Sequence, residues 1–161
     1  MYIHVTMSTE SARKQNEIAL SLPPLPCACS TLRRAARAVT HLYEEQLRPT
    51  GLRVTQFTLL MTLERAEGVT QGKLGELLAL DSTTLTRMLK LLEKEDWIRS
   101  TLGDDRRERH LHLTPAGQRK LAQARTYWEQ AEDRLLGVLG EADWRKLQAL
   151  LDTTTHAAKR A

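Results

Sequence analysis

The sequence is poor in aromatic residues, in strand-like runs and in long hydrophobic segments. Aromatic side chains make up 4% of its 161 residues, and only one residue is phenylalanine. This scarcity favours a mainly helical fold. No apolar run approaches the roughly 20 residues that a membrane-spanning helix needs. Met1–Asn16 lacks the apolar core and cleavage site of a signal peptide, so we expect a cytoplasmic protein with no membrane partner.

The signatures of an enzyme are also missing. The sequence contains no glycine-rich phosphate loop, no nucleophile motif and no pair of carboxylates placed for acid–base chemistry. Its five histidines do not cluster at the spacing of metal ligands. Two cysteines in a reducing compartment do not make a disulfide framework. We therefore expect a protein that is not an enzyme and has no resident cofactor or metal.

Ser82–Glu93 predicts an amphipathic helix. Leu85, Met88 or Leu89, and Leu92 recur at three- to four-residue spacing and would form one buried stripe. The opposite face carries hydroxyls and long cations, which phosphates and base edges accept. A second short amphipathic segment, Thr70–Leu80, lies just upstream and is connected through Asp81. Together the two segments predict a helix-turn-helix whose second helix reads the major groove.

A β-hairpin is predicted directly after this helix. Ile98–Leu102 has the pattern of a strand, Gly103–Arg107 that of a charged turn, and Glu108–Thr114 that of a returning strand. His110 and His112 alternate with leucines on the second strand, so they would face solvent or DNA. The hairpin is a wing, and the fold class is mainly α: a winged helix-turn-helix with a two-stranded wing.

Three motifs occur in an order that identifies a family. They are Leu80-Asp-Ser-Thr-Thr-Leu-Thr-Arg-Met-Leu, then Asp105-Arg-Arg107, then Leu113-Thr-Pro-Ala-Gly117. With them the sequence resembles the MarR family of bacterial transcription regulators from about Pro26 to the C-terminus. The resemblance implies a homodimer that binds double-stranded DNA at a pseudo-palindromic operator. The usual role of proteins in this family leads us to expect a repressor.

The residues expected to bind DNA lie on the predicted recognition helix and in the wing. On the helix, the hydroxyls would fix register on phosphates and Arg87 would contact a guanine edge. In the wing, the resemblance implies that Arg107 enters the minor groove while Asp105 orients its guanidinium, and Arg106 and Arg109 add phosphate contacts. The full set is Ser82, Thr83, Thr84, Thr86, Arg87, Lys90, Asp105, Arg106, Arg107 and Arg109.

The remaining segments predict an arm and a dimerisation region. The prolines of Leu22–Pro26 forbid helix, so residues 1–26 would form a flexible N-terminal arm. Residues 27–50 and 116–161 would be the helical dimerisation region, because their apolar stripes exceed what the winged helix of residues 51–115 can cover. We expect N-caps at Ser30, Thr55 and Thr114.

Cys27 and Cys29 leave three interpretations open. Cys29 lies beside the start of the first predicted helix, where the helix dipole and nearby arginines favour the peroxide-reactive thiolate. The resemblance places Cys29 at the sensor cysteine of the organic-hydroperoxide-sensing branch and Tyr43 at a tyrosine near that thiol. Arg33 departs from that pattern, which has a second tyrosine there. A redox switch, a weak soft-metal site and cysteines without a sensing role all remain open.

The effector is accordingly a small aromatic ligand or an oxidant. The family often binds phenolic or other aromatic compounds between the dimerisation helices and the winged helix, and Arg37, Tyr43 and Phe57 would line that crevice. The alternative to a DNA-binding regulator is an interaction module that keeps the fold without binding DNA. A steep fall of DNA affinity with salt would separate the two.

We expect Arg107→Ala to weaken binding to operator DNA by about tenfold, as for a lost contact worth about 1.4 kcal/mol. The planar, charged guanidinium suits a narrow, electronegative groove, and alanine has no group that can make this contact. Dimerisation should not change, because Arg107 lies outside the predicted dimerisation region. A gel-shift titration measures the affinity and light scattering the oligomeric state; unchanged affinity would reject the role.

Overall fold

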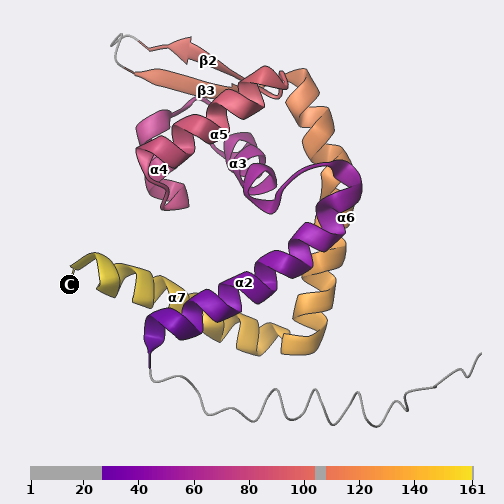
Figure 1. The fold of residues 1–161 in the computed structure, drawn as a ribbon, viewed down its shortest axis with the longest axis vertical. Coiled ribbons are helices and arrows are strands. Elements are labelled where there is room, and N and C mark those ends of the chain that lie inside the picture. Colours follow the sequence, from indigo (N-terminus) through magenta and orange to yellow (C-terminus); the bar gives the residue numbers. More distant parts are fainter. Residues whose placement is uncertain (1–26, 104–107, 161) are drawn as a thin grey trace, which may run out of the picture. The chain divides into compact units, whose positions relative to one another are not determined.

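The computed structural model describes residues 27–103 and 108–160, and Figure 1 shows the fold. The expected arm at residues 1–26 lies outside these residues. The chain divides into two compact units, and the boundary between them follows Val39, within helix α2 (Ala28–Leu47). The second unit holds the remaining elements and contains the winged helix. Within the described residues, no helix is both long and apolar enough to span a membrane.

The described elements are mostly helices with one small antiparallel sheet, which confirms the predicted fold class. After α2 the order is η1 (Arg48–Thr50), α3 (Val54–Arg65), β1 (Val69–Thr70), α4 (Gln71–Leu78), α5 (Ser82–Lys94), β2 (Ile98–Leu102), β3 (Arg109–Leu113), α6 (Pro115–Leu139) and α7 (Glu141–Arg160).

The helix-turn-helix consists of α4 and α5, as predicted. Thr70 Oγ1 accepts from Lys73 N (3.3 Å) at the start of α4. Asp81 Oδ1 accepts from Thr84 N (2.8 Å) at the start of α5. Ala79 ends α4 in the left-handed region (φ 50°), which turns the chain sharply toward Asp81. Side-chain caps therefore determine where both helices begin.

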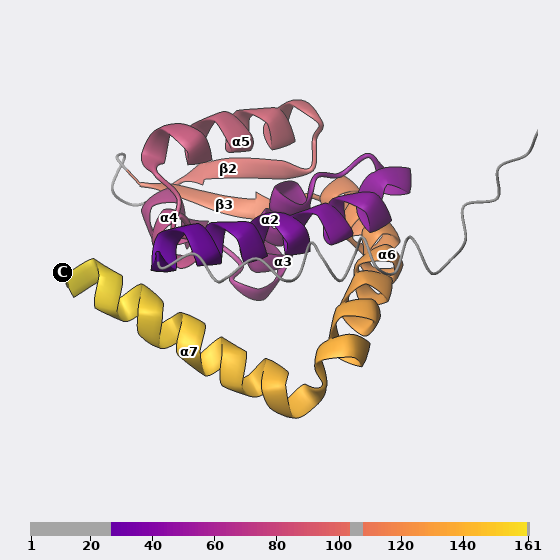
Figure 2. The ribbon, with the colours of Figure 1, turned by 60° about the horizontal axis from the view of Figure 1, so that its bottom comes forward.

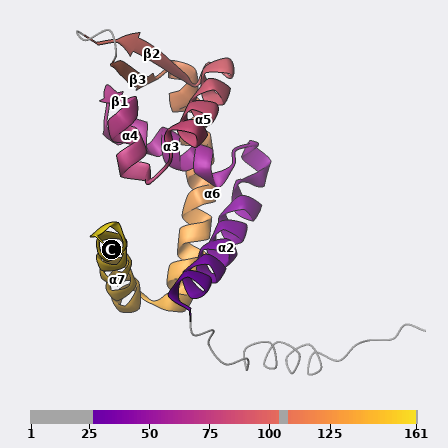
Figure 3. The same ribbon diagram turned by 60° about the vertical axis from the view of Figure 1, so that its left-hand side comes forward.

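The sheet has three strands, not the two that the sequence predicts. Its order is β1-β3-β2, with β2 and β3 forming the predicted wing hairpin. Val69 pairs with Leu111 and Thr70 with His110, so β1 adds to the edge of β3 that faces away from β2. Figure 3 shows β1 beside β3 at the start of α4. Two residues are too short for an alternating pattern, and their pairing depends on a distant segment.

Two of the three predicted helix caps are wrong. Thr31 N already donates to Cys27 O (3.0 Å), so α2 begins before Ser30. Thr55 lies inside α3, whose N-cap is Arg53.

At that N-cap, acceptors come from other residues. Gln56 Oε1 accepts from Arg53 N (2.8 Å), and Glu44 Oε1, from α2, accepts from Val54 N (3.0 Å). The third predicted cap is confirmed: Thr114 Oγ1 accepts from Gly117 N (3.0 Å).

The leucine stripe of α5 packs into the core as predicted. Leu85, Leu89 and Leu92 are buried, in one cluster with Ile98 of β2 and Leu111 of β3. Figure 2 shows α5 running along the hairpin. At full burial each leucine stabilises the fold by about 1.5–3 kcal/mol. The packing holds the opposite, polar face of α5 toward solvent.

A close junction joins the wing to α6. Thr114 Oγ1 donates to Asp96 O (2.5 Å), and Thr114 N donates to Trp97 O (3.1 Å). Lys120 Nζ lies 5.1 Å from the Trp97 ring centroid and donates to Thr50 O (2.5 Å). Gly117 lies against the same backbone, and a Cβ there would be 1.9 Å from Trp97 O. Only glycine permits this approach.

We expect Gly117→Ala to lower the free energy of unfolding by about 1–3 kcal/mol, because the new methyl group must push α6 away from Trp97. Gly137→Ala is the matched control in the same helix, since its Cβ would meet nothing within 4 Å. The control should be neutral or stabilising by up to about 1 kcal/mol. Denaturant unfolding at one protein concentration measures both; wild-type stability of Gly117→Ala would contradict the role of this junction.

Candidate nucleic-acid interface

A shallow hollow of about 410 Å³ lies on the polar face of α5. Five of the six α5 residues predicted to bind DNA line it: Ser82, Thr83, Thr86, Arg87 and Lys90. Four of these side chains are exposed, and Thr86 is half-buried. Two are permanent or near-permanent cations, three carry hydroxyls, and none of the five is acidic. Such a surface attracts the phosphates of a nucleic acid and offers donors to base edges.

Thr84, the sixth predicted residue, belongs to the helix cap. Its hydroxyl donates to Asp81 Oδ2 (2.7 Å), and its backbone N donates to Asp81 Oδ1. These hydrogen bonds hold the pKa of the Asp81 carboxyl below its ordinary value, which keeps the capping group charged. The hydroxyl hydrogen of Thr84 is therefore already used in the N-cap of α5.

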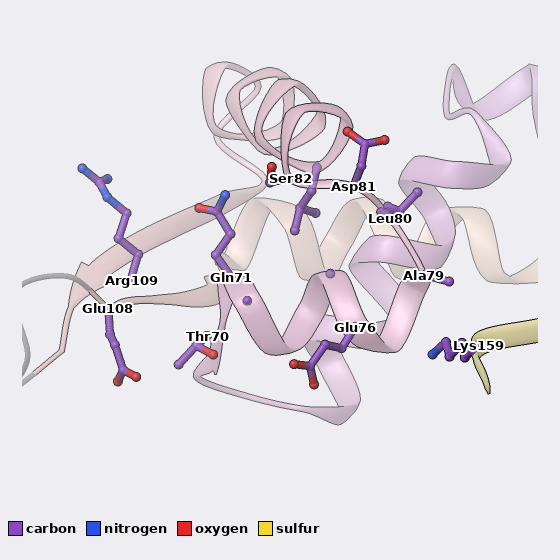
Figure 4. A pocket seen from close by; sticks show the side chains of 13 residues that line it. Thr70, Gln71, Glu76, Ala79, Leu80, Asp81, Ser82, Glu108, Arg109 and Lys159 are labelled. Carbon is purple, nitrogen blue, oxygen red and sulfur yellow. The ribbon is translucent and has the colours of Figure 1, made fainter. Parts of the chain in front are cut away.

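A larger groove of about 1010 Å³ adjoins the hollow at Ser82. It runs past α4, the turn Ala79–Asp81 and the wing residues Glu108 and Arg109, which lie next to the hairpin turn (Figure 4). Figure 4 places Glu108 and Arg109 at one end of the groove and Lys159 at the other. Because acids and bases both line it, its volume does not make it the better anion site. The smaller hollow, with cations alone, suits DNA better.

The wing contributes Arg109 on the core-facing side of the hairpin. Its Nη1 donates to Ser100 Oγ (3.3 Å). Gly103 N donates to Glu108 O (3.0 Å) and closes the hairpin below its tip. Asp105, Arg106 and Arg107 lie outside the described residues, so their predicted roles stay predictions.

The two wing histidines lie on the other side of the hairpin. His110 Nδ1 is 2.7 Å from Gly68 O, and His112 Nε2 is 3.1 Å from Thr101 Oγ1. Both side chains are half-buried and hydrogen-bonded within the protein. Their contacts connect the wing to the segment before β1 and strengthen the hairpin itself.

The sequence did not predict one contact of the recognition helix. Gln71, the first residue of α4, donates from Nε2 to Thr86 Oγ1 (3.0 Å). The only signal available was its place directly after the N-cap Thr70. Nothing in the sequence pairs it with a residue on the next helix.

Both cysteines are free and exposed. Cys27 immediately precedes α2, and Cys29 lies in its first turn. A thiol at such a position is open to oxidants in solution.

Tyr43 and Phe57 are engaged inside the second unit. Tyr43 is 8% exposed and donates to Glu132 Oε1 (2.5 Å). Burial, and then the Glu132 carboxylate, raise the pKa of Tyr43 far above its ordinary value, so it remains a donor. Phe57 is 1% exposed and stacks on Trp128 with ring centroids 5.8 Å apart.

The ligand crevice expected at Arg37, Tyr43 and Phe57 stays a prediction, and Phe57 is not open to solvent. Its ring already packs against Trp128, so a ligand would have to displace part of the core to reach it. Arg37 is exposed on α2. Neither the hollow nor the groove contains Arg37, Tyr43 or Phe57.

Comparisons with known proteins agree with this geometry. Residues 52–108 match the family model described as MarR family. The transcriptional regulator MosR of Mycobacterium tuberculosis, solved in complex with DNA, is 31% identical, with a TM-score of 0.76 over 83% of this chain and 97% of that one.

Curated relatives include two HTH-type transcriptional regulators. YwoH of Bacillus subtilis is 29% identical over 112 residues, which is 70% of this chain and 82% of that protein. SarZ of Staphylococcus epidermidis is 36% identical over 85 residues, 52% of this chain and 57% of that protein.

The match reaches nearly the full length of the solved MosR chain, and it coincides with a helix-turn-helix, a wing and a cationic recognition helix. Proteins of this kind bind DNA to regulate transcription and are not enzymes. This chain belongs to the MarR family of transcription regulators.

Proposed function

We propose that this protein is a homodimeric repressor that reads a pseudo-palindromic operator with α5 and the wing of each subunit. The hollow on α5 carries the proposal. Arg87 contacts a guanine edge, Lys90 a phosphate, and Ser82, Thr83 and Thr86 hydrogen-bond to the groove. The wing contacts the adjoining DNA backbone and minor groove through Arg109, together with Asp105, Arg106 and Arg107. The complex of MosR with DNA supports duplex DNA as the ligand.

Exposed leucines of the C-terminal helix support the dimer. Leu147, Leu150 and Leu151 of α7 are 38%, 65% and 37% exposed, and within this fully described helix no side chain is buried. A helix with an apolar stripe but no burial needs a partner surface. A second copy supplies one with two-fold symmetry, which sets the two recognition helices about 34–36 Å apart. Residues 27–50 and 116–161 would form this interface, and 51–115 the DNA-binding domain.

Repression ends when an effector favours a dimer geometry that no longer matches successive major grooves. Of the two effectors that the sequence leaves open, the described contacts favour an oxidant. Cys27 and Cys29 are exposed and free, whereas Phe57 of the expected aromatic crevice is buried against Trp128. Oxidation at Cys29 would alter the first turn of α2, within the proposed dimer region.

We expect Arg87→Ala to weaken operator binding by about tenfold to a hundredfold, the range for losing a guanine contact of about 1.4–2.8 kcal/mol. Arg65→Ala removes the same charge from an exposed site at the end of α3, outside both the hollow and the proposed dimer region, and should bind as the wild type does. Gel-shift titrations at several salt concentrations measure affinity and salt slope. Equal affinities of the two variants, or affinity that ignores salt, would point to an interaction module that does not bind DNA.

We expect peroxide to abolish the wild-type footprint on the protein's own promoter region and reductant to restore it. Cys29→Ser should keep its footprint under peroxide, because the reactive thiol is gone. Cys27→Ser is the matched control, two residues away and also exposed, and peroxide should still abolish its footprint. If Cys29→Ser is still released by peroxide, or if only aromatic acids release the wild type, the cysteine is not the sensor.

A further inference from the structure

Gln71 lies outside α5, and its side chain contacts the proposed reading face. It is the first residue of α4, and its Nε2 donates to Thr86 Oγ1 (3.0 Å) across fifteen positions of sequence. Thr86 lines the cationic hollow with Arg87 and Ser82. Gln71 itself lines the adjoining groove. The hydrogen bond therefore connects the two helices of the helix-turn-helix at the edge of the surface that would meet DNA.

The direction of this hydrogen bond determines what Thr86 can offer. A threonine hydroxyl has one hydrogen and two acceptor lone pairs. Because Gln71 supplies the hydrogen of their bond, Thr86 keeps its own hydrogen for another partner. Among the side-chain hydrogen bonds of the described residues, Thr86 takes part in no other, in contrast to Thr84, which donates to Asp81.

We propose that Gln71 is a specificity-determining positioning residue: by holding Thr86 as its acceptor, it makes the Thr86 hydroxyl a directed donor to a base acceptor in the major groove. The matching acceptors are purine N7, guanine O6 and thymine O4. Cytosine presents only an amino donor there, so the Thr86 hydrogen finds no acceptor on it, and only the remaining lone pair of the hydroxyl could engage this base. This inference rests on the proposed DNA-binding function and adds to it the class of base that one residue reads.

The test is a base-preference profile for each half-site, obtained by selecting binding duplexes from a randomised pool. The full-length protein is compared with Thr86→Val, Gln71→Ala and the double variant. We expect one position to lose its preference by about threefold to tenfold in all three, since each loses one directed hydrogen bond. The double variant should lose no more than Thr86→Val alone, because the two residues act as one unit.

Gln71→Glu distinguishes a residue that orients the Thr86 hydroxyl from one that only links α4 to α5. A carboxylate only accepts, so Thr86 would have to donate to it and would lose the hydrogen meant for DNA. The helices stay linked, yet the preference at that position should disappear. The added negative charge weakens binding to all sequences alike, so the relative preference is the quantity to compare. Thr86→Ser, which keeps the hydroxyl, should retain the preference.

The outcomes distinguish a failure of this inference from a failure of the proposed DNA-binding function on which it rests. If the wild type selects no sequence at all, the proposed function fails and the role of Gln71 fails with it. If the wild type selects a sequence but Gln71→Ala or Gln71→Glu keeps the full preference, only the role of Gln71 is overturned. Losses from Gln71→Ala and Thr86→Val that simply add also overturn it. Thermal unfolding of each variant shows that the compared proteins are folded.

Discussion

Burial of one leucine stripe on α5 is the constraint on which the functional surface depends. Leu85, Leu89 and Leu92 lie in the core with Ile98 and Leu111, so the helix cannot rotate without exposing them. Each would cost about 1.5–3 kcal/mol if exposed. The same packing that stabilises the domain therefore determines which hydroxyls and cations face outward. Stability and recognition use opposite faces of one helix.

The ends of the neighbouring elements keep that helix in place. Asp81 caps its first turn, and Gln71 connects it to α4. At its far end the chain turns at Asp96 and Trp97, where Thr114 and Gly117 bring the wing and α6 together. These contacts are short and specific, whereas the exposed stripe of α7 has no such partner within its own unit. The many contacts of α5 and the exposed apolar stripe of α7 agree with a protein in which α7 packs against a second copy of the chain.

Local patterns predicted the elements whose causes are local. The stripe of α5, both wing strands and the Thr114 cap follow from spacing and from one residue's preference, and the structure confirms them. Apart from the start of α2, the failures share a different cause. Strand β1 depends on pairing with residues about forty positions away, and the α3 cap uses Glu44 of another helix. The contacts of Gln71 with Thr86 and of Tyr43 with Glu132 are likewise tertiary.

The placement of the polar face of α5 in the major groove is tested most directly by cleavage of DNA from that face. Thr83→Cys, in a background with Cys27→Ser and Cys29→Ser, would carry an iron chelate that cleaves nearby deoxyribose. Cuts on both strands should centre on two major-groove positions about 34–36 Å apart. The same chelate at Arg65→Cys, at the end of α3 and outside the proposed dimer region, supplies the comparison. Indistinguishable cutting from the two sites, or a single unrepeated cluster of cuts, would contradict a dimer that reads DNA with this helix.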